Sequence, residues 1–317
     1  MSFQNRFEIF RGRSCPAWVR VAFTVLVLVF AAREIVPTLL GAQMAPQAGQ
    51  SATASARQTG ARQTGAGQPG AGPQRGGRGP RYVEPDPINF DDHTGWQSLF
   101  DGSTLDGWDG PADVWTVQNG AIVATSTAAN PTGSTYLIWK GGEPANFEFK
   151  TEIKLEGAGS NSGIQFRAVR LGALPDKKYS QWDTRGYQAD YDYVNSNTGA
   201  LIECCAGSSR GVPIRTDRAY RGQIVSAAIA AGAKPTLLGT FGDPDAVGGY
   251  IKIGDWNEIH LIARGDTMIY LINGHLMSVF FDDNPTMAAS KGVLALQLEG
   301  RGDIKTSFRD IWLKNLP

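Results

Sequence analysis

The sequence has little cysteine. Only three occur in 317 residues, Cys15, Cys204 and Cys205. They form no C-x-x-C pair that could hold a metal, and two adjacent cysteines can join only in a strained vicinal disulfide. We expect Cys204 and Cys205 to be packing residues or partly reactive thiols rather than a functional site.

Motifs of nucleotide-dependent and serine-hydrolase chemistry are also missing. The sequence contains neither a P-loop nor a G-x-S-x-G elbow. Its three histidines, His93, His260 and His275, have no ligand spacing, so we expect surface or core positions for them. The turns G-D-P-D (242–245) and D-D-N (282–284) could bind calcium, although ordinary turns use the same residues. No cofactor is predicted beyond this open question of a divalent metal.

Basic residues are distributed unevenly along the chain. Residues 1–80 hold nine Arg, no Lys and only two acidic residues, Glu8 and Glu34. Residues 81–317 therefore hold 21 basic and 28 acidic residues, a net charge of −7. Affinity for nucleic acid depends on a basic surface, so we predict no nucleic-acid partner.

Residues 1–42 have the layout of a secretory signal peptide. Arginines accompany the apolar run V-R-V-A-F-T-V-L-V-L-V-F-A-A (19–32), and small residues stand at 41 and 42. We expect export to the periplasm or cell envelope, with cleavage after Ala42. The alternative is an uncleaved anchor, although the run is shorter than the roughly 20 residues that a span needs. Contact with a membrane would then be limited to this segment.

Residues 43–88 are predicted to be a disordered linker. They are mostly Ala, Gln, Gly, Pro, Ser, Thr and Arg, and they include the tandem A-R-Q-T-G-A-R-Q-T-G at 56–65. Such a stretch has almost nothing apolar to bury and cannot form a core. The folded domain is predicted over residues 89–317.

Short strands between turns dominate residues 89–317. The stretch F-E-F-K-T-E-I-K-L-E (147–156) alternates apolar and charged residues, which predicts a strand with one buried face and one solvated Glu–Lys face. Asn-Gly pairs at 119–120 and 273–274 predict hairpins. Other predicted elements are strands at 186–192, 200–204, 256–263, 292–299 and 306–313, and a short helix at 224–231. This pattern indicates an all-β fold, a two-sheet antiparallel sandwich or jelly roll.

Several predicted strands carry polar side chains where they alternate with core residues. In N-S-G-I-Q-F-R-A (161–168), Gln165 and Arg167 share a face opposite Ile164 and Phe166. The remaining polar positions are Gln188, Asp190 and Asp192 in 186–192, Glu203 beside Leu201, and Gln297 with Glu299 in 294–299. Amides, carboxylates and nearby aromatic rings suit sugars, so we expect a cleft on the concave side of one sheet. Alternatively, these faces merely meet water.

The stretch G-W-Q-S-L-F-D-G-S-T-L-D-G-W (95–108) resembles the opening of the 3-keto-disaccharide hydrolase family. Matching stretches follow in order, among them W-T-V-Q-N-G-A-I, N-S-G-I-Q-F-R, G-Y-Q-A-D and F-R-D-I-W-L, so the resemblance covers about residues 93–316. It implies a concanavalin A-like lectin/glucanase jelly roll that acts on glycosides with a ketone at C3. The chain departs from many members at Gly186–Asp190, where they have G-Y/F-E-x-Q and this chain resembles a G-Y-Q-A-D branch. It also departs from many members of that branch at Glu299, where they have His. It also has a long stretch at 206–250 that would suit a lid or rim loop.

A 3-keto-glycoside would react by elimination, because the ketone acidifies the hydrogen at C2. A base removes that proton, donors stabilise the enolate oxygen, and an acid or a metal assists the leaving oxygen. We assign Asp190 as the base and Glu203 as the acid, although these two roles could be exchanged. We assign Arg167 as the donor that stabilises the enolate oxygen. Substrate binding is assigned to Asn161, Gln165, Gln188, Gln297 and Glu299. The alternatives are a non-catalytic, lectin-like module tethered at the cell envelope and a purely structural domain there.

Overall fold

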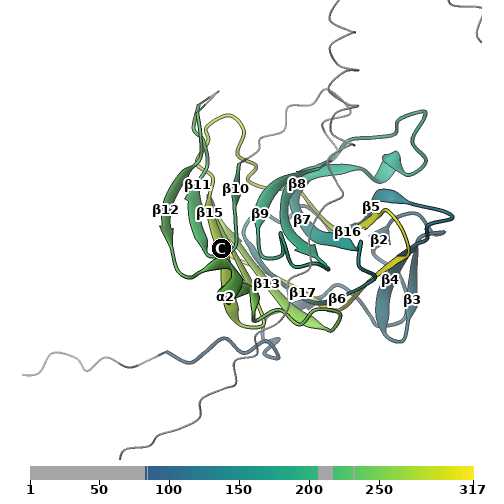
Figure 1. The fold of residues 1–317 in the computed structure, drawn as a ribbon, viewed down its shortest axis with the longest axis horizontal. Coiled ribbons are helices and arrows are strands. Elements are labelled where there is room, and N and C mark those ends of the chain that lie inside the picture. The colour runs from purple at the N-terminus through teal and green to yellow at the C-terminus, as the bar shows by residue number, and fades with distance from the viewer. Residues whose placement is uncertain (1–82, 84, 206–216, 231–232) are drawn as a thin grey trace, which may run out of the picture. The chain divides into compact units, whose positions relative to one another are not determined.

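Two packed β-sheets make up nearly all the regular structure of the residues that the structure describes (Figure 1). The computed structural model describes residues 83, 85–205, 217–230 and 233–317. The larger sheet contains β1 (Gln97–Ser98), β3 (Trp115–Gln118), β4 (Ala121–Ser126), β6 (Phe147–Glu156), β11 (Gln223–Ser226), β12 (Thr236–Thr240), β13 (Asn257–Arg264), β14 (Thr267–Ile272), β15 (His275–Phe281) and β17 (Ile304–Asn315). The smaller contains β2 (Trp108–Asp109), β5 (Gly133–Trp139), β7 (Asn161–Arg170), β8 (Thr184–Asp192), β9 (Leu201–Cys205), β10 (Arg218–Ala219) and β16 (Val293–Gly300).

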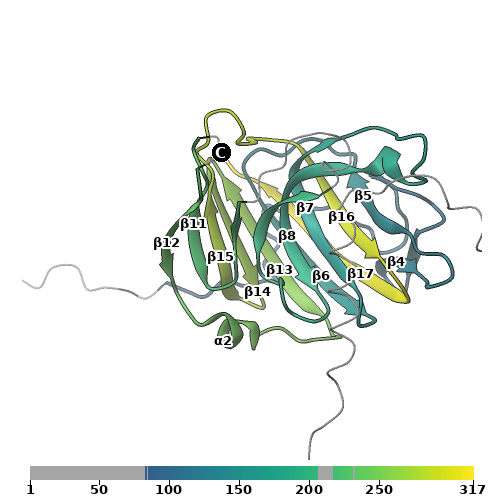
Figure 2. The ribbon, with the colours of Figure 1, turned by 45° about the horizontal axis from the view of Figure 1, so that its top comes forward.

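The strand order gives two layers. The ten-stranded sheet runs β12-β11-β15-β14-β13-β6-β17-β4-β3, with β1 on β17, and the seven-stranded sheet runs β10-β9-β8-β7-β16-β5-β2. Among the described strands, every pairing except that of β11 with β15 is antiparallel. The seven-stranded sheet lies inside the curve of the ten-stranded sheet, as both views show (Figures 1 and 2). The predicted two-sheet jelly roll is therefore confirmed.

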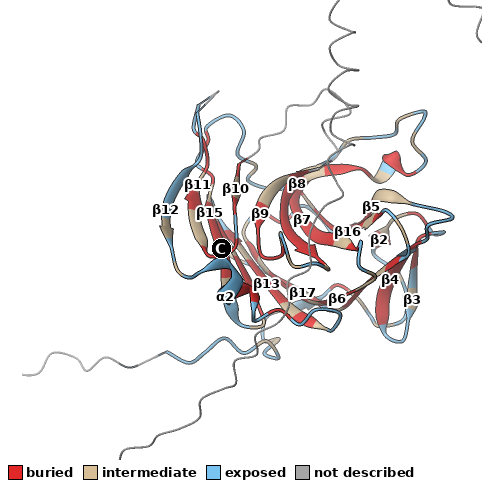
Figure 3. Cartoon of the chain, in the orientation of Figure 1, coloured by how far each residue is buried: buried red, intermediate tan, exposed pale blue. Residues whose placement is uncertain are grey.

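The hydrophobic core lies between the two sheets, where buried residues gather (Figure 3). Phe147 and Phe149 of β6 face Ile164 and Phe166 of β7, and the rings of Phe147 and Phe166 meet edge to face at 6.0 Å. Tyr187 of β8 extends this aromatic layer. Because side chains alternate along a strand, the residues between these apolar ones point to the outer face of each sheet.

Both predicted Asn-Gly hairpins are present. Asn119 and Gly120 join β3 to β4, and Asn273 and Gly274 join β14 to β15. All four residues have positive φ, between 51° and 76°, as a two-residue turn between twisted strands requires.

The predicted helix at 224–231 is wrong. Gln223–Ser226 forms β11, which pairs with β12 on one side and β15 on the other. A segment hydrogen-bonded on both sides stays extended whatever its local preference. Besides the short 3₁₀ turn η1 (Ser180–Trp182), the described helix is α2 (Pro244–Gly248).

The turns considered for calcium have structural roles. Asp243 caps α2 by accepting hydrogen bonds from the backbone of Asp245 and Ala246. In the other turn, Asn284 Oδ1 accepts from the backbone N–H groups of Thr286 and Met287. Within the described ranges, no group of three or more His, Cys, Asp or Glu residues could hold a metal ion.

The outer face of β6 is not the solvated ladder that its alternation predicted. Lys150 is only 2% exposed, because the segment that precedes β1 crosses over it. Its ammonium group donates to the carbonyl oxygens of Asn89, Phe90 and Asp92 at 3.0–3.1 Å and lies 4.4 Å from the ring of Trp96. Alternation placed Lys150 on the correct face but could not show that a distant segment covers it.

Several predictions fall wholly or partly outside the described residues. These are the leader at 1–42, nearly all of the linker at 43–88, and residues 206–216 of the proposed rim loop. No helix within the described residues is both long and apolar enough to cross a membrane. Cys204, expected to be a packing residue or a thiol, is disulfide-bonded.

Candidate functional site

A β-bulge in β7 changes which side chains share a face. The pairing of β7 with β8 shifts between Phe166 and Val169, and Arg167 has a φ of 47°. An extra residue in one strand reverses the alternation beyond it. The prediction that Arg167 stands beside Gln165 on the polar face is therefore wrong.

Arg167 points instead toward the ten-stranded sheet. Its guanidinium donates to the carbonyl oxygen of Ala145 at 2.7 and 3.0 Å, to Gly265 at 2.8 Å and to Ala289 at 3.3 Å. Ala145 precedes β6 and Gly265 lies in the turn between β13 and β14. The side chain is 2% exposed. Arg167 thus ties three loops together, and its donors are occupied by backbone.

Glu203 also lies on the core side of the seven-stranded sheet. It is directly opposite Tyr187, whose ring is in the core, and its carboxylate is 3.9 Å from Arg185. Glu203 and Arg167 border the same cavity of about 30 Å³, which is far too small for a sugar. The structure brings these two predicted residues together, but on the opposite side of the sheet from Asp190.

The outer face of the seven-stranded sheet carries a connected network of amides. Gln165 Nε2 donates to Gln188 Oε1 at 3.2 Å, and Gln188 Nε2 donates to Gln297 Oε1 at 2.9 Å and Asp190 Oδ1 at 3.0 Å. Gln165 and Gln297 both donate to the hydroxyl of Tyr136. The three glutamines are at most 1% exposed. Three predicted binding residues and the predicted base therefore form one group, beneath the surface rather than along an open cleft.

Gly163 explains how this network fits on the sheet. A Cβ at this position would lie 2.7 Å from the carbonyl oxygen of Ala189 and 2.9 Å from the side chain of Gln188. The missing side chain leaves the space that Gln188 occupies as it crosses from β8 toward Gln297 on β16. The motif N-S-G-I-Q therefore supplies both a polar residue and the gap its neighbour needs.

Asp190 is the group in this network best placed for proton transfer. It is 6% exposed, and burial raises its pKa to about 7; Gln188 opposes the shift by hydrogen bonding, while the nearby carboxylates of Asp192 and Glu299 add to it. A carboxyl group with this pKa can accept a proton and return it near neutral pH.

Asp192, two residues along the same strand, behaves differently. Burial alone would raise its pKa, but hydrogen bonds from Ser196, Thr198 and the backbone of Asn197 outweigh burial and hold the pKa below its usual value. Its carboxylate organises the turn after β8. Two carboxylates on one face therefore have opposite characters, set by their surroundings.

A cavity of about 300 Å³ opens at the end of this outer face. Asn161 and Glu299 line it, as do Asp192 and Arg301. Asn161 lies between Asp192 and Glu299 in the pairing of three neighbouring strands, and its Oδ1 is buried without a hydrogen-bond partner. Arg301 forms an ion pair with Glu299. The cavity is large enough for about one sugar unit.

Two residues of this region, Tyr136 and Arg301, were not predicted from the sequence. Tyr136 lies in a nearly unbroken buried run of β5, where no alternation sets it apart. Arg301 follows β16 in a turn, where no periodicity applies. A strand pattern identifies polar residues only when they interrupt an apolar face, and neither residue does so.

Comparison with known proteins identifies the family. Residues 95–314 match the 3-keto-alpha-glucoside-1,2-lyase-like domain. The chain belongs to this family. The family supports a carbohydrate-related function for the jelly-roll domain. No curated protein matches the chain.

Solved structures similar to the chain are distant. A putative glycosyl hydrolase from Parabacteroides distasonis is 17% identical over 71% of this chain and 95% of its own, with a TM-score of 0.42. The carbohydrate-binding module CBM66 from Bacillus subtilis is 14% identical over 67% and 98%, with a TM-score of 0.39. The laminarinase from Rhodothermus marinus is 11% identical over 69% and 95%, with a TM-score of 0.40.

Proposed function

We propose that the chain cleaves 3-keto-glycosides by elimination at the outer face of the seven-stranded sheet. The observation on which this proposal rests is the buried carboxyl group of Asp190, with a pKa of about 7, on the same face of β8 as Asp192, which lines the cavity of sugar size. The family of lyase-like domains supports the substrate class. Perturbed pKa values cluster at functional sites, which favours a catalytic face over a plain sugar-binding one.

In the proposed reaction, the Asp190 carboxylate takes the proton from C2 of the sugar. The electron pair forms the enolate of the C3 ketone and then a C1–C2 double bond as the C1–O bond breaks. Asp190, now neutral, returns its proton to the leaving oxygen, so one residue serves as base and acid in turn. Water adds to the unsaturated sugar afterwards. Glu203 has no part in this scheme because it lies on the other side of the sheet.

The developing negative charge on the C3 oxygen needs a donor. Arg167 was our first assignment, but its donors are occupied by the backbone. Arg301 lines the cavity, so we assign it this role, with Asn161 and Glu299 gripping sugar hydroxyls. Gln165, Gln188 and Gln297 hold Asp190 in position rather than touching the substrate, since they bind one another and are buried.

The proposal is tested by comparing two substrates that differ only at C3. The purified full chain should release the aglycone from a 3-keto-glucoside and leave the unoxidised glucoside essentially intact, because its C2 proton is not acidic. Equal turnover of both would indicate an ordinary glycosidase. Turnover of neither, with saturable glycan binding, would indicate the lectin-like module instead.

A further inference from the structure

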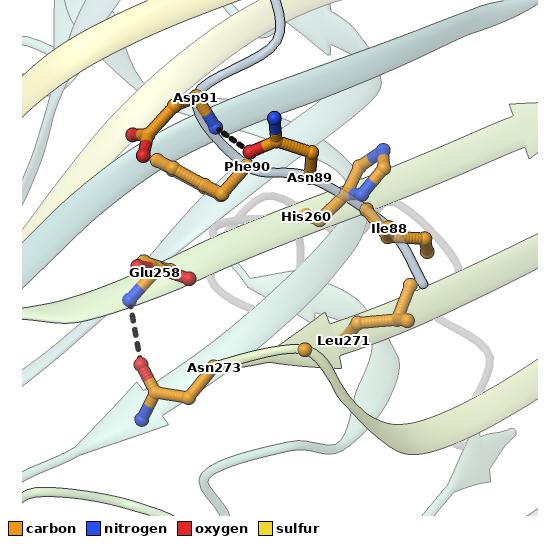
Figure 4. Close-up of a pocket in the computed structure, with 9 residues that line it drawn as sticks. Ile88, Asn89, Phe90, Asp91, Glu258, His260, Leu271 and Asn273 are labelled. Carbon is orange, nitrogen blue, oxygen red and sulfur yellow. Dashed lines mark hydrogen bonds between the residues drawn. The ribbon is translucent and has the colours of Figure 1, made fainter. Parts of the chain in front are cut away.

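A second cavity, of about 290 Å³, lies on the outer face of the ten-stranded sheet (Figure 4). Its floor is formed by β13 and β14, and its wall by residues 88–91, the same segment that covers Lys150. Nothing in the proposed reaction uses this cavity, because the Asp190 network belongs to the other sheet.

His260 of β13 lines this cavity, and one of its ring nitrogens has no hydrogen-bond partner. The residue is 6% exposed, and its Nε2 lies 2.8 Å from the carboxylate of Glu148. A carboxylate can only accept, so Nε2 carries the proton and Nδ1 remains an acceptor. Nδ1 is buried and has no partner. Figure 4 shows the ring beside Ile88 and Asn89.

The charge state of His260 supports this description. Burial lowers its pKa; hydrogen bonding and attraction from Glu148 oppose that effect, and the nearby Lys150 lowers the pKa further. The ring is therefore neutral at pH 7, as an accepting Nδ1 requires.

The other polar groups at the cavity mainly accept hydrogen bonds. Asp91 and Glu258 border it, and neither has an ion-pair partner among the described residues. The adjacent cation, Lys150, already donates to three carbonyl oxygens. The Asn89 side chain adds an amide whose Oδ1 accepts from the backbone of Asp91. A ligand must therefore bring several donors of its own.

The apolar residues that line the cavity indicate which class of ligand it can bind. Ile88, Phe90 and Leu271 form the remaining wall. A small ammonium ion would pair with the carboxylates but leave this apolar wall in contact with water, and ion pairs that water reaches contribute little to binding. A pyranose offers hydroxyl donors at its edge and an apolar ring face, and so uses both surfaces.

We propose that this cavity is a second saccharide site, which binds one neutral hexose unit through hydroxyl groups donated to Asp91, Glu258 and His260. It would hold a sugar away from the reacting centre, on the opposite side of the molecule's core. The site goes beyond the proposed elimination and does not depend on it.

Titration with methyl β-D-glucopyranoside tests this site by NMR of the ¹⁵N-labelled full chain. The sugar carries no ketone, so turnover cannot interfere. We expect saturable shifts at Phe90, Asp91, His260 and Gly274, with a Kd on the order of 1–10 mM, as befits a single small sugar. The ring nitrogen Nδ1 of His260 should shift as it gains a donor.

A variant with its matched control completes the test. The double variant Asp91→Asn/Glu258→Gln keeps side-chain shape and should weaken binding at least about tenfold. Glu156→Gln, on the same outer face but paired with Lys305 outside the cavity, should leave the Kd unchanged. His260→Gln is a second probe, expected to lose binding without loss of 3-keto-glucoside turnover.

Three results would overturn this second site. One is no shift at these residues with 100 mM sugar. Another is shifts confined to the cavity of Asn161 and Glu299. The third is a response to methylammonium chloride but not to the sugar, which would make the cavity a cation site. None of these results bears on 3-keto-glucoside turnover, so failure here is separate from failure of the proposed reaction.

Discussion

The two sides of the seven-stranded sheet hold similar charged groups in contrasting situations. On the outer side, the buried carboxyl group of Asp190 has a raised pKa and lies in an amide network, and Asp192 on the same face of β8 lines a sugar-sized cavity. On the core side, Arg167 is also buried and Glu203 is partly buried, but they border a cavity of only about 30 Å³. Burial of a charged group therefore does not by itself mark a functional site. What distinguishes the outer side is a titratable group on the same sheet face as a sugar-sized cavity.

The largest expected effect on stability is at Arg167, on the core side of the seven-stranded sheet. Arg167→Ala should lower the free energy of unfolding by roughly 3–5 kcal/mol, because the carbonyl groups of Ala145, Gly265 and Ala289 lose their donor. Urea unfolding measures this. Arg170→Ala, on the same strand, breaks an ion pair with Asp109 whose side chains are 40% and 36% exposed, and should cost less than about 1 kcal/mol. Unchanged stability with lost turnover in the Arg167 variant would return Arg167 to the reacting centre.

The two carboxylates of the outer side, Asp190 and Asp192, should affect folding stability with opposite dependence on pH. The folded state favours neutral Asp190, so its stabilisation is complete below about pH 4 and is lost as the pH rises through about 7. Asp190→Asn should therefore become the more stable protein above pH 7, by at most about 4 kcal/mol.

Asp192 provides the opposite sign as a control. Its pKa is lowered in the folded state, so it stabilises the protein above its ordinary pKa and loses that effect as the pH falls through the lowered value. Asp192→Asn should destabilise the protein at pH 7 and less so in acid. Parallel pH dependence in the two variants, measured by thermal unfolding, would contradict the assigned environments.

A smaller effect on stability is expected at the outer face of the ten-stranded sheet. Lys150→Met should cost about 2 kcal/mol, because three carbonyl groups of the covering segment lose one donor. Lys154→Met, on the same face of β6 but partly exposed, should cost less than about 0.5 kcal/mol. Equal costs in denaturant unfolding would show that the segment does not depend on Lys150.

The two sheet layers of the fold were predicted correctly from the sequence. The side chains that share each sheet face were predicted only in part. Alternation placed Gln188 and Asp190 opposite Tyr187 correctly, since β8 is regular there. It failed at Arg167, because no residue in N-S-G-I-Q-F-R-A signals the bulge that reverses the pattern. Glu203 was counted with the polar face although it was set beside Leu201, a core residue.

Other features were beyond any local pattern. The pKa of Asp190 depends on its burial and on the carboxylate of Glu299, a residue remote in sequence, and the burial of Lys150 depends on residues about 60 positions away. Such features arise from packing between remote segments, so strand periodicity cannot show them.

In our proposal, the chemistry takes place at the outer side of the seven-stranded sheet, with Asp190 as the base. Its most direct test is turnover of a 3-keto-glucoside by two matched carboxamide variants, with folding checked by circular dichroism. Asp190→Asn should reduce kcat/KM by about 10²-fold or more and abolish the rise in activity through about pH 7 that the wild type should show. Glu203→Gln should change kcat/KM by less than about threefold. A large loss in the Glu203 variant with near-normal turnover in the Asp190 variant would contradict the claim and place the reaction on the core side of the sheet.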